Sequence, residues 1–300
     1  LSRPLELSLK NVPSKDIDDI DHAPLHQDMQ QYGFQDYSGI GDLIGLRKGG
    51  YVYDALTLAQ SVSWLRSKGR NMSDSQQPWL LAVNLVNPHD VMFIDTDAPG
   101  ESIQWHSKLN ENQPMSPSQP PENALYAARW DRVPLPASRH QPFMQPGRPA
   151  AQRDYQLARA MLVGQFPDED RRWRKLQDYY FNCIRDNDTH VVALLNELDA
   201  LGLTEKTIVV MTSDHGELQG FHQMHGKGTC VYQQQVQVPM IISHPAYPGG
   251  KVCHARTSHL VLTPTLLGLT GKPAEQIAPL LHDRKGKDFS ALIKDPEQAT

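Results

Sequence analysis

The strongest constraint on the fold is a helical pattern that is followed at once by a short β-branched run and a polar loop. Residues 174–201 place apolar side chains at helical spacing, with acidic residues just upstream and Gly202 just downstream, which predicts one long helix. Residues 207–212 have the sequence TIVVMT, which favours a strand. Helix, turn and strand in this order are typical of an αβ unit. The sequence therefore predicts an α/β fold with a mostly parallel sheet between helices.

Four further segments continue this alternation. Residues 51–66 carry apolar side chains at helical spacing and predict a surface helix. Residues 79–87 are almost continuously apolar, which predicts a buried strand that opens into the loop of residues 87–90, NPHD. A second short strand is predicted at residues 238–243, with a proline near its start. Thr263 and a following proline then predict the start of another helix.

An irregular excursion interrupts the pattern between about residues 97 and 150. It holds ten of the 23 prolines and shows no sustained period. Long irregular segments inside a compact domain are usually functional lids or linkers, so this one is a candidate for shaping a substrate pocket. A plain surface insertion is the alternative.

Charge and composition exclude several classes of function. A net charge of -5, a pI near 6.2 and the lack of a Lys/Arg run argue against a nucleic-acid partner. No apolar stretch approaches the roughly 18 to 20 residues that span a bilayer. Cys183, Cys230 and Cys253 form neither a disulfide framework nor a Cys-x-x-Cys metal pair. Cellular compartment and oligomeric state stay open.

Chemically active residue types gather at the predicted strand ends. In open α/β sheets ligands bind outside the carboxyl ends of strands, and two such ends here carry His89 and the pair Asp214 and His215. The loop that follows Asp214 and His215 also contains His222, His225 and Lys227. A carboxylate can bind a hard cation, an ammonium can bind negative charge and an imidazole can transfer a proton. Together these groups suit the chemistry of an anionic ester.

The order of these motifs resembles the sulfatase family of the alkaline-phosphatase superfamily. The segments that carry the resemblance are NPHD at 87–90, TSDHGE at 212–217, G-x-H at 220–222, GKGT at 226–229, VPMII at 238–242, PTLLGLTG at 264–271 and GKDFS at 286–290. They follow one another in the family's order from about His89 to Ser290.

The resemblance implies roles for particular residues. Asp214 and His215 would be two ligands of one divalent metal, usually calcium in this family. Asparagine is more common at the second position, and imidazole is a less natural ligand for calcium, so magnesium, manganese and zinc stay open. Lys227 and His89 would bind the sulfate and assist departure of the alcohol oxygen. His222 is a weaker candidate for substrate binding, and the substrate would be a small or oligosaccharide sulfate ester.

Two parts of the family's machinery are missing from the sequence. The nucleophile is a formylglycine made from a Cys/Ser-x-Pro-x-Arg motif, beside two further metal-binding aspartates, and no such motif occurs in these 300 residues. Cys253 is followed by an arginine three positions later but lacks the proline. We therefore expect residues 1–300 to be a partial sulfatase catalytic domain whose N-terminal strands are missing, and which shows no turnover alone.

Two other readings remain open. A phosphonate monoester or phosphodiester hydrolase would use the same scaffold, and the Asp-His pair, which also occurs in phosphonate monoester hydrolases, mildly favours it. A non-catalytic protein that binds an anion is the alternative outside enzymes, because fold alone does not establish activity.

Overall fold

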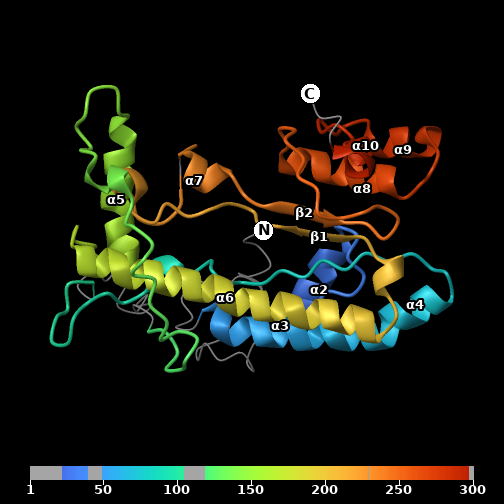
Figure 1. Ribbon diagram of the computed structural model, residues 1–300, viewed down its shortest axis with the longest axis horizontal. Coiled ribbons are helices and arrows are strands. Elements are labelled where there is room, and N and C mark those ends of the chain that lie inside the picture. Colours follow the sequence, from blue (N-terminus) through green and yellow to red (C-terminus); the bar gives the residue numbers. More distant parts are fainter. Residues whose placement is uncertain (1–21, 40–48, 105–118, 229, 297–300) are drawn as a thin grey trace. The chain divides into compact units, whose positions relative to one another are not determined.

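The computed structural model describes residues 22–39, 49–104, 119–228 and 230–296 of the chain. These residues form two compact units (Figure 1). Unit 1 contains the described residues up to Leu198 together with Glu217–Gln234. Unit 2 contains Asp199–Gly216 and the described residues from Gln235 onward.

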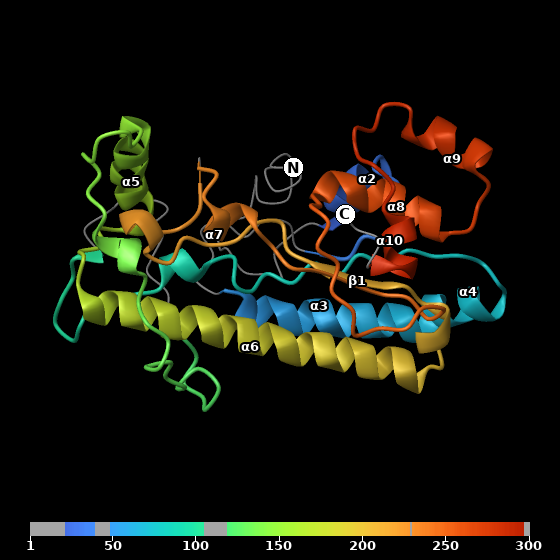
Figure 2. The ribbon, with the colours of Figure 1, turned by 45° about the horizontal axis from the view of Figure 1, so that its top comes forward.

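Unit 1 is mostly helical. Its helices are α2 (His22–Gln30), α3 (Gly50–Trp64), α4 (Arg70–Asp74), α5 (Ala150–Val163) and α6 (Asp170–Ala200), with a π-helical turn at Leu65–Gly69 and 3-10 turns at Val91–Phe93, Ala137–His140 and Phe221–Gln223. The predicted helices at residues 51–66 and 174–201 are confirmed as α3 and α6. Helix α3 lies along the C-terminal half of α6 (Figures 1 and 2).

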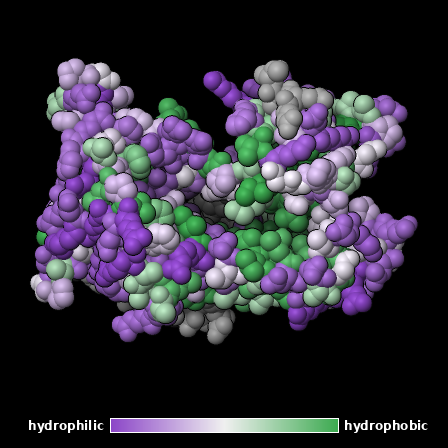
Figure 3. Space-filling model, viewed as in Figure 1, coloured by the Kyte–Doolittle hydropathy of each residue, from purple (hydrophilic) through white to green (hydrophobic). Residues whose placement is uncertain are grey.

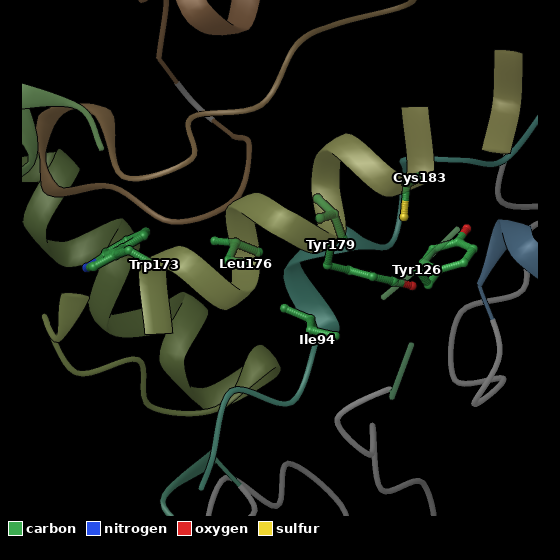
Figure 4. Packing of buried hydrophobic residues seen from close by; sticks show 7 residues of the cluster. Ile94, Tyr126, Trp173, Leu176, Tyr179 and Cys183 are labelled. Atoms are coloured by element: carbon green, nitrogen blue, oxygen red, sulfur yellow. The ribbon is translucent and has the colours of Figure 1, made fainter. Parts of the chain in front are cut away.

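One face of α6 forms the hydrophobic core of unit 1 (Figure 4). The buried cluster consists of Val91, Ile94, Tyr126, Trp173, Leu176, Tyr179 and Cys183. The four members from α6 recur every three or four residues, which places them on one side of the helix. Further along the same helix, Val192 and Leu195 are 47% and 43% exposed. Leu198, near the end of the helix, is buried again, so the burial of the predicted apolar face is interrupted in the C-terminal half of α6.

Side chains of α6 also secure the irregular segment that precedes it. Asp178 accepts a hydrogen bond from the backbone N–H of Trp130 at 2.8 Å. The amide of Asn182 donates to the backbone oxygens of Tyr126 and Ala128 at 3.1 and 2.9 Å. Buried backbone groups need partners, and α6 provides them where the segment has no ladder of its own.

Unit 2 contains the only sheet found among the described residues. Strands β1 (Val209–Thr212) and β2 (Met240–Ser243) pair in antiparallel register, with Val209 opposite Ser243 and Thr212 opposite Met240. The remaining elements are a 3-10 turn at Thr204–Lys206, α7 (Gln233–Val236), which begins in unit 1, a 3-10 turn at His259–Val261, α8 (Leu262–Leu269), α9 (Ala274–Leu281) and α10 (Ser290–Lys294). Both strands and the helix α8 lie where the sequence predicts them.

The prediction of a buried strand at residues 79–87 is wrong for this structure. The segment is assigned to no strand, and Leu80 is 65% exposed. A strand needs a neighbour that accepts and donates its backbone hydrogen bonds, and no described segment pairs with this one. The parallel arrangement predicted for the sheet is likewise not seen in the described part of the chain, where the one pairing is antiparallel.

No helix in the described ranges combines the length and the apolar character needed to cross a membrane.

Arg172 is a fully buried arginine of unit 1. Its guanidinium is fully buried and contacts Asp97 at 2.7 Å, Glu101 at 2.8 Å and Glu169 at 3.1 Å. Asp97 is itself buried. One cation thus joins α6 to the start of the irregular segment, and its removal would leave a carboxylate buried without its partner.

We expect Arg172→Leu to lower the free energy of unfolding by about 3–5 kcal/mol, because it leaves Asp97 buried and uncompensated. The matched control is Arg171→Leu, which removes the neighbouring arginine from partly exposed ion pairs and should cost no more than about 1 kcal/mol. Urea denaturation of the full-length protein measures both. Equal stability of the two variants would contradict the role given to Arg172.

Candidate functional site

The loop that carries His89 is fixed by α3. The carboxylate of Asp54 accepts hydrogen bonds from the backbone N–H groups of Val86 and Asn87 at 2.5 and 2.9 Å. Asp54 is fully buried, and this burial raises its pKa, although the two backbone donors oppose the rise. His89 follows with a half-exposed imidazole, and its Nδ1 donates to the carboxylate of Asp90 at 2.9 Å.

Lys227 reaches this loop from far along the chain. Its Nζ donates a hydrogen bond to the backbone oxygen of His89. The two residues predicted to contact an anionic ester are therefore neighbours within unit 1, although 138 positions separate them in the sequence. The ammonium also bridges two loops, so Lys227 has a structural contact that its position between two glycines did not predict.

Asp214 and His215 follow strand β1 in unit 2. Ring nitrogen Nδ1 of His215 lies 2.9 Å from the backbone oxygen of Gly216, and since a carbonyl only accepts, Nδ1 carries the proton. The other ring nitrogen, Nε2, lies 3.3 Å from Oδ2 of Asp214. An imidazole nitrogen and an exposed carboxylate oxygen at this separation fit two ligands of one cation.

A complete metal site needs more than this pair. Among the described residues no group of three or more His, Cys, Asp or Glu side chains could hold a metal ion. Asp214 and His215 belong to unit 2, whereas His89 and Lys227 belong to unit 1. The convergence of all four on one cleft stays a prediction.

His222 is held by the irregular segment rather than by the Lys227 side chain. Its ring stacks on Tyr232 with centroids 3.7 Å apart, and Nδ1 donates to Gln141 at 2.7 Å. Its backbone N–H donates to Ser138, and Arg148 donates to its backbone oxygen. Burial, with the nearby Arg148 charge, lowers the pKa of His222. These contacts join residues 138–148 to the loop that bears Lys227.

Two buried ionisable residues of the same loop escaped the sequence-based assignment of roles. Burial raises the pKa of the Glu217 carboxyl, while Lys227 and Arg159 oppose the rise. His225 is buried with its ring stacked on Phe166 at 4.3 Å. Burial, reinforced by Arg159, lowers the pKa of His225 to about 3. The spacing of polar residues gives no sign of burial, so sequence alone could not distinguish these two from exposed loop residues.

Comparisons with known proteins match this chain to sulfatases. The family model described as Sulfatase matches residues 13–272. The ulvan-active sulfatase of Formosa agariphila is 34% identical over 133 residues, which cover 43% of this chain and 24% of that protein. Arylsulfatase K of Bos taurus is 26% identical over 218 residues, which cover 72% of this chain and 36% of that protein. The chain thus spans well under half the length of these curated relatives.

A solved structure shows the same fold. The phosphonate monoester hydrolase SpPMH from Silicibacter pomeroyi superimposes with a TM-score of 0.54 at 22% sequence identity, covering 90% of this chain and 49% of that one. At this identity the similarity establishes the architecture alone.

His225 predicts a pH dependence of stability. Its pKa is about 3 in the folded protein and about 6.5 when unfolded, so below about pH 6.5 the unfolded chain binds a proton that the folded chain does not. Stability is complete above that pH and falls by about 1.4 kcal/mol per unit as the pH decreases toward 3. We expect His225→Phe, which keeps a ring against Phe166, to remove this slope. His254→Gln, at an exposed histidine, should keep it. Denaturation midpoints between pH 5 and 8 measure the difference, and identical slopes would refute the assignment.

Proposed function

The chain belongs to the sulfatase family, and from this we propose that the protein hydrolyses a sulfate monoester, either small or part of an oligosaccharide. The observation that carries the proposal is the contact between Lys227 Nζ and the backbone of His89. It places the ammonium of Lys227 on the loop that carries the His89 imidazole, and the two groups together suit an ester with negatively charged oxygens and a leaving group that needs a proton.

Within this proposal the two residues have different tasks. Lys227 neutralises sulfate oxygens and the charge that develops as the ester bond breaks. His89 donates Nδ1–H to Asp90, which orients the ring and leaves Nε2 to exchange a proton with the departing alcohol oxygen. A carboxylate that fixes one nitrogen of a catalytic histidine is a common arrangement in hydrolases.

Asp214 and His215 would hold one divalent cation. When bound, such a cation supplies positive charge for the sulfate oxygens. Calcium is the family's usual choice, but the imidazole ligand also suits manganese or zinc, and magnesium is a further alternative. No Cys/Ser-x-Pro-x-Arg motif occurs in residues 1–300, so the formylglycine nucleophile is not assigned to a residue of this sequence. We also propose a mostly parallel sheet for the complete catalytic domain, to which further strands contribute.

One observation favours a second candidate function. The Asp214-His215 pair, in place of the Asp-Asn more common among sulfatases, suits a phosphonate monoester or phosphodiester hydrolase. The anion-binding groups are the same in both cases, so the substrate decides between them. A non-catalytic anion-binding protein would turn over neither substrate.

We expect Lys227→Ala in the full-length enzyme to lower kcat/KM for an aryl sulfate by about 10²- to 10³-fold, because one donor to the developing charge is lost. Lys227→Arg should restore little of the lost kcat/KM, because the planar guanidinium of arginine does not replace a compact ammonium. Lys206→Ala, at an exposed lysine, is the control and should behave as wild type. An alanine variant with more than about a third of wild-type turnover would eliminate the catalytic role.

The same kinetics identify the substrate class. An aryl sulfate and an aryl phosphonate monoester with the same leaving group are compared for the wild type. A preference for the sulfate supports the first function, a preference for the phosphonate supports the second, and turnover of neither supports the non-catalytic alternative.

The metal pair gives a prediction that does not depend on activity. We expect Asp214→Ala to reduce the divalent metal that stays bound after dialysis, measured by elemental analysis of the purified full-length protein. His215→Asn should keep a metal but shift the preference toward calcium over zinc, because an oxygen ligand replaces a nitrogen. Asp283→Ala is the matched control, since Asp283 lies 2.8 Å from His282 in a similar exposed pair. An equal loss of metal in Asp214→Ala and Asp283→Ala would overturn the assignment.

A further inference from the structure

Helix α5 lies against the loop that carries Lys227. In both ribbon views a short orange turn of that loop is beside α5 (Figures 1 and 2). The residues of α5 that contact the loop segment are Gln152, Tyr155, Gln156 and Arg159. Their spacing of three and four residues places them on one face of the helix. Mostly hydrophilic side chains cover α5 in the space-filling view (Figure 3).

The contacts nearest Lys227 are made to its backbone and to that of His225. The hydroxyl of Tyr155 donates to the backbone oxygen of Lys227. The side-chain amide of Gln156 accepts from the N–H of His225 at 3.0 Å and donates to its carbonyl at 3.2 Å. Hydrogen bonds on both sides of Gly226 therefore fix the course of the main chain at the lysine.

The two glycines that flank Lys227 allow this close approach. At Gly226 a Cβ atom would lie 2.7 Å from Nη2 of Arg159, and the backbone has a φ of +81°. At Gly228 a Cβ atom would overlap the ring and hydroxyl of Tyr155. A side chain at Gly228 would push Tyr155 and α5 away from the loop, whereas at Gly226 the positive φ disfavours any side chain. The glycines are thus part of a packed contact between a helix and a loop.

We propose that this face of α5 positions Lys227 for catalysis, with Tyr155 and Gln156 as the positioning residues. The inference depends on the proposed function, in which the Lys227 ammonium contacts the ester. A lysine has a flexible four-carbon stem, and a glycine-flanked backbone would add further freedom. Charge stabilisation requires the donor to be placed to within about 0.5 Å of its working geometry. The bonds from α5 remove the freedom of the backbone at the point where the side chain begins.

The test is a double-mutant cycle between Tyr155 and Lys227 in the full-length enzyme. Tyr155→Phe removes one hydroxyl and keeps the ring. We expect it to lower kcat on an aryl sulfate by roughly 10-fold or more, with KM and the thermal midpoint near wild type, because misplacement of a catalytic group by about 1 Å costs up to 10²-fold. In the Lys227→Ala background the same change should have no further effect, since Tyr155 acts through the lysine.

A second variant and a control complete the experiment. Gln156→Leu removes the amide that binds the His225 backbone, and it should show the same loss of kcat and the same dependence on Lys227. It replaces Tyr155→Phe in the cycle if that variant folds poorly. Leu157→Ala changes an exposed position of the same helix, where the side chain is 63% exposed, and should leave kcat unchanged.

The possible results separate the two hypotheses. If the wild type hydrolyses no sulfate ester, the proposed function fails. If the wild type is active and Lys227→Ala retains turnover, the catalytic role of Lys227 fails and the positioning role fails with it. If Lys227→Ala is impaired while both α5 variants equal wild type, only the positioning role is overturned. If the α5 variants lose kcat equally in the presence and absence of Lys227, Tyr155 and Gln156 act on the structure in general. That result also overturns the positioning role.

Discussion

Helix α6 provides packing and hydrogen-bond partners for chain segments that have no regular structure of their own. Most of unit 1 depends on these contacts. Its apolar face buries Trp173, Leu176 and Tyr179 in the core. Next to that face, Asp178 and Asn182 bond the backbone of residues 126–130. An irregular segment can be packed tightly only if its buried N–H and C=O groups find partners. One helix therefore provides both the hydrophobic contacts and the hydrogen bonds that these segments need. The loops with the candidate catalytic residues are connected to segments that pack around this helix.

The sequence predicted the elements whose signal is local. Helices α3 and α6, strands β1 and β2 and helix α8 lie where periodicity and β-branched composition place them. The strand expected at residues 79–87 failed because apolar composition cannot say whether a hydrogen-bonding partner exists. Pairing direction in the sheet is non-local in the same way. Helix α5 follows the predicted irregular excursion and was not predicted, although good helix formers follow Pro149, because its inner face is polar and shows no apolar stripe.

The candidate site likewise has features that the sequence predicts and features that it does not. The order of the motifs predicted that His89 and Lys227 belong together, and their contact agrees with it. Nothing in the sequence marked Glu217 and His225 as buried or Tyr155 as a partner of the Lys227 backbone. Burial decides the ionisation of such groups, since a charge that loses water must be compensated by its neighbours. The types of residue at a site are therefore readable from sequence, whereas their charge states and supports depend on the packing of distant segments.

The contacts between α5 and the Lys227 loop involve main-chain atoms of the loop. Every amino acid has the same main-chain donors and acceptors, apart from the missing donor of proline. Evolutionary drift in the loop is therefore restricted at the two glycines, because a side chain at Gly228 would collide with Tyr155 and Gly226 has a positive φ. It is restricted much less where only the backbone is recognised. On the helix the reverse applies, because Tyr155 and Gln156 act through their side chains. Related proteins should accordingly vary in the loop and in α5 at different positions, and a graft of the loop alone into another scaffold would leave its supporting partners behind.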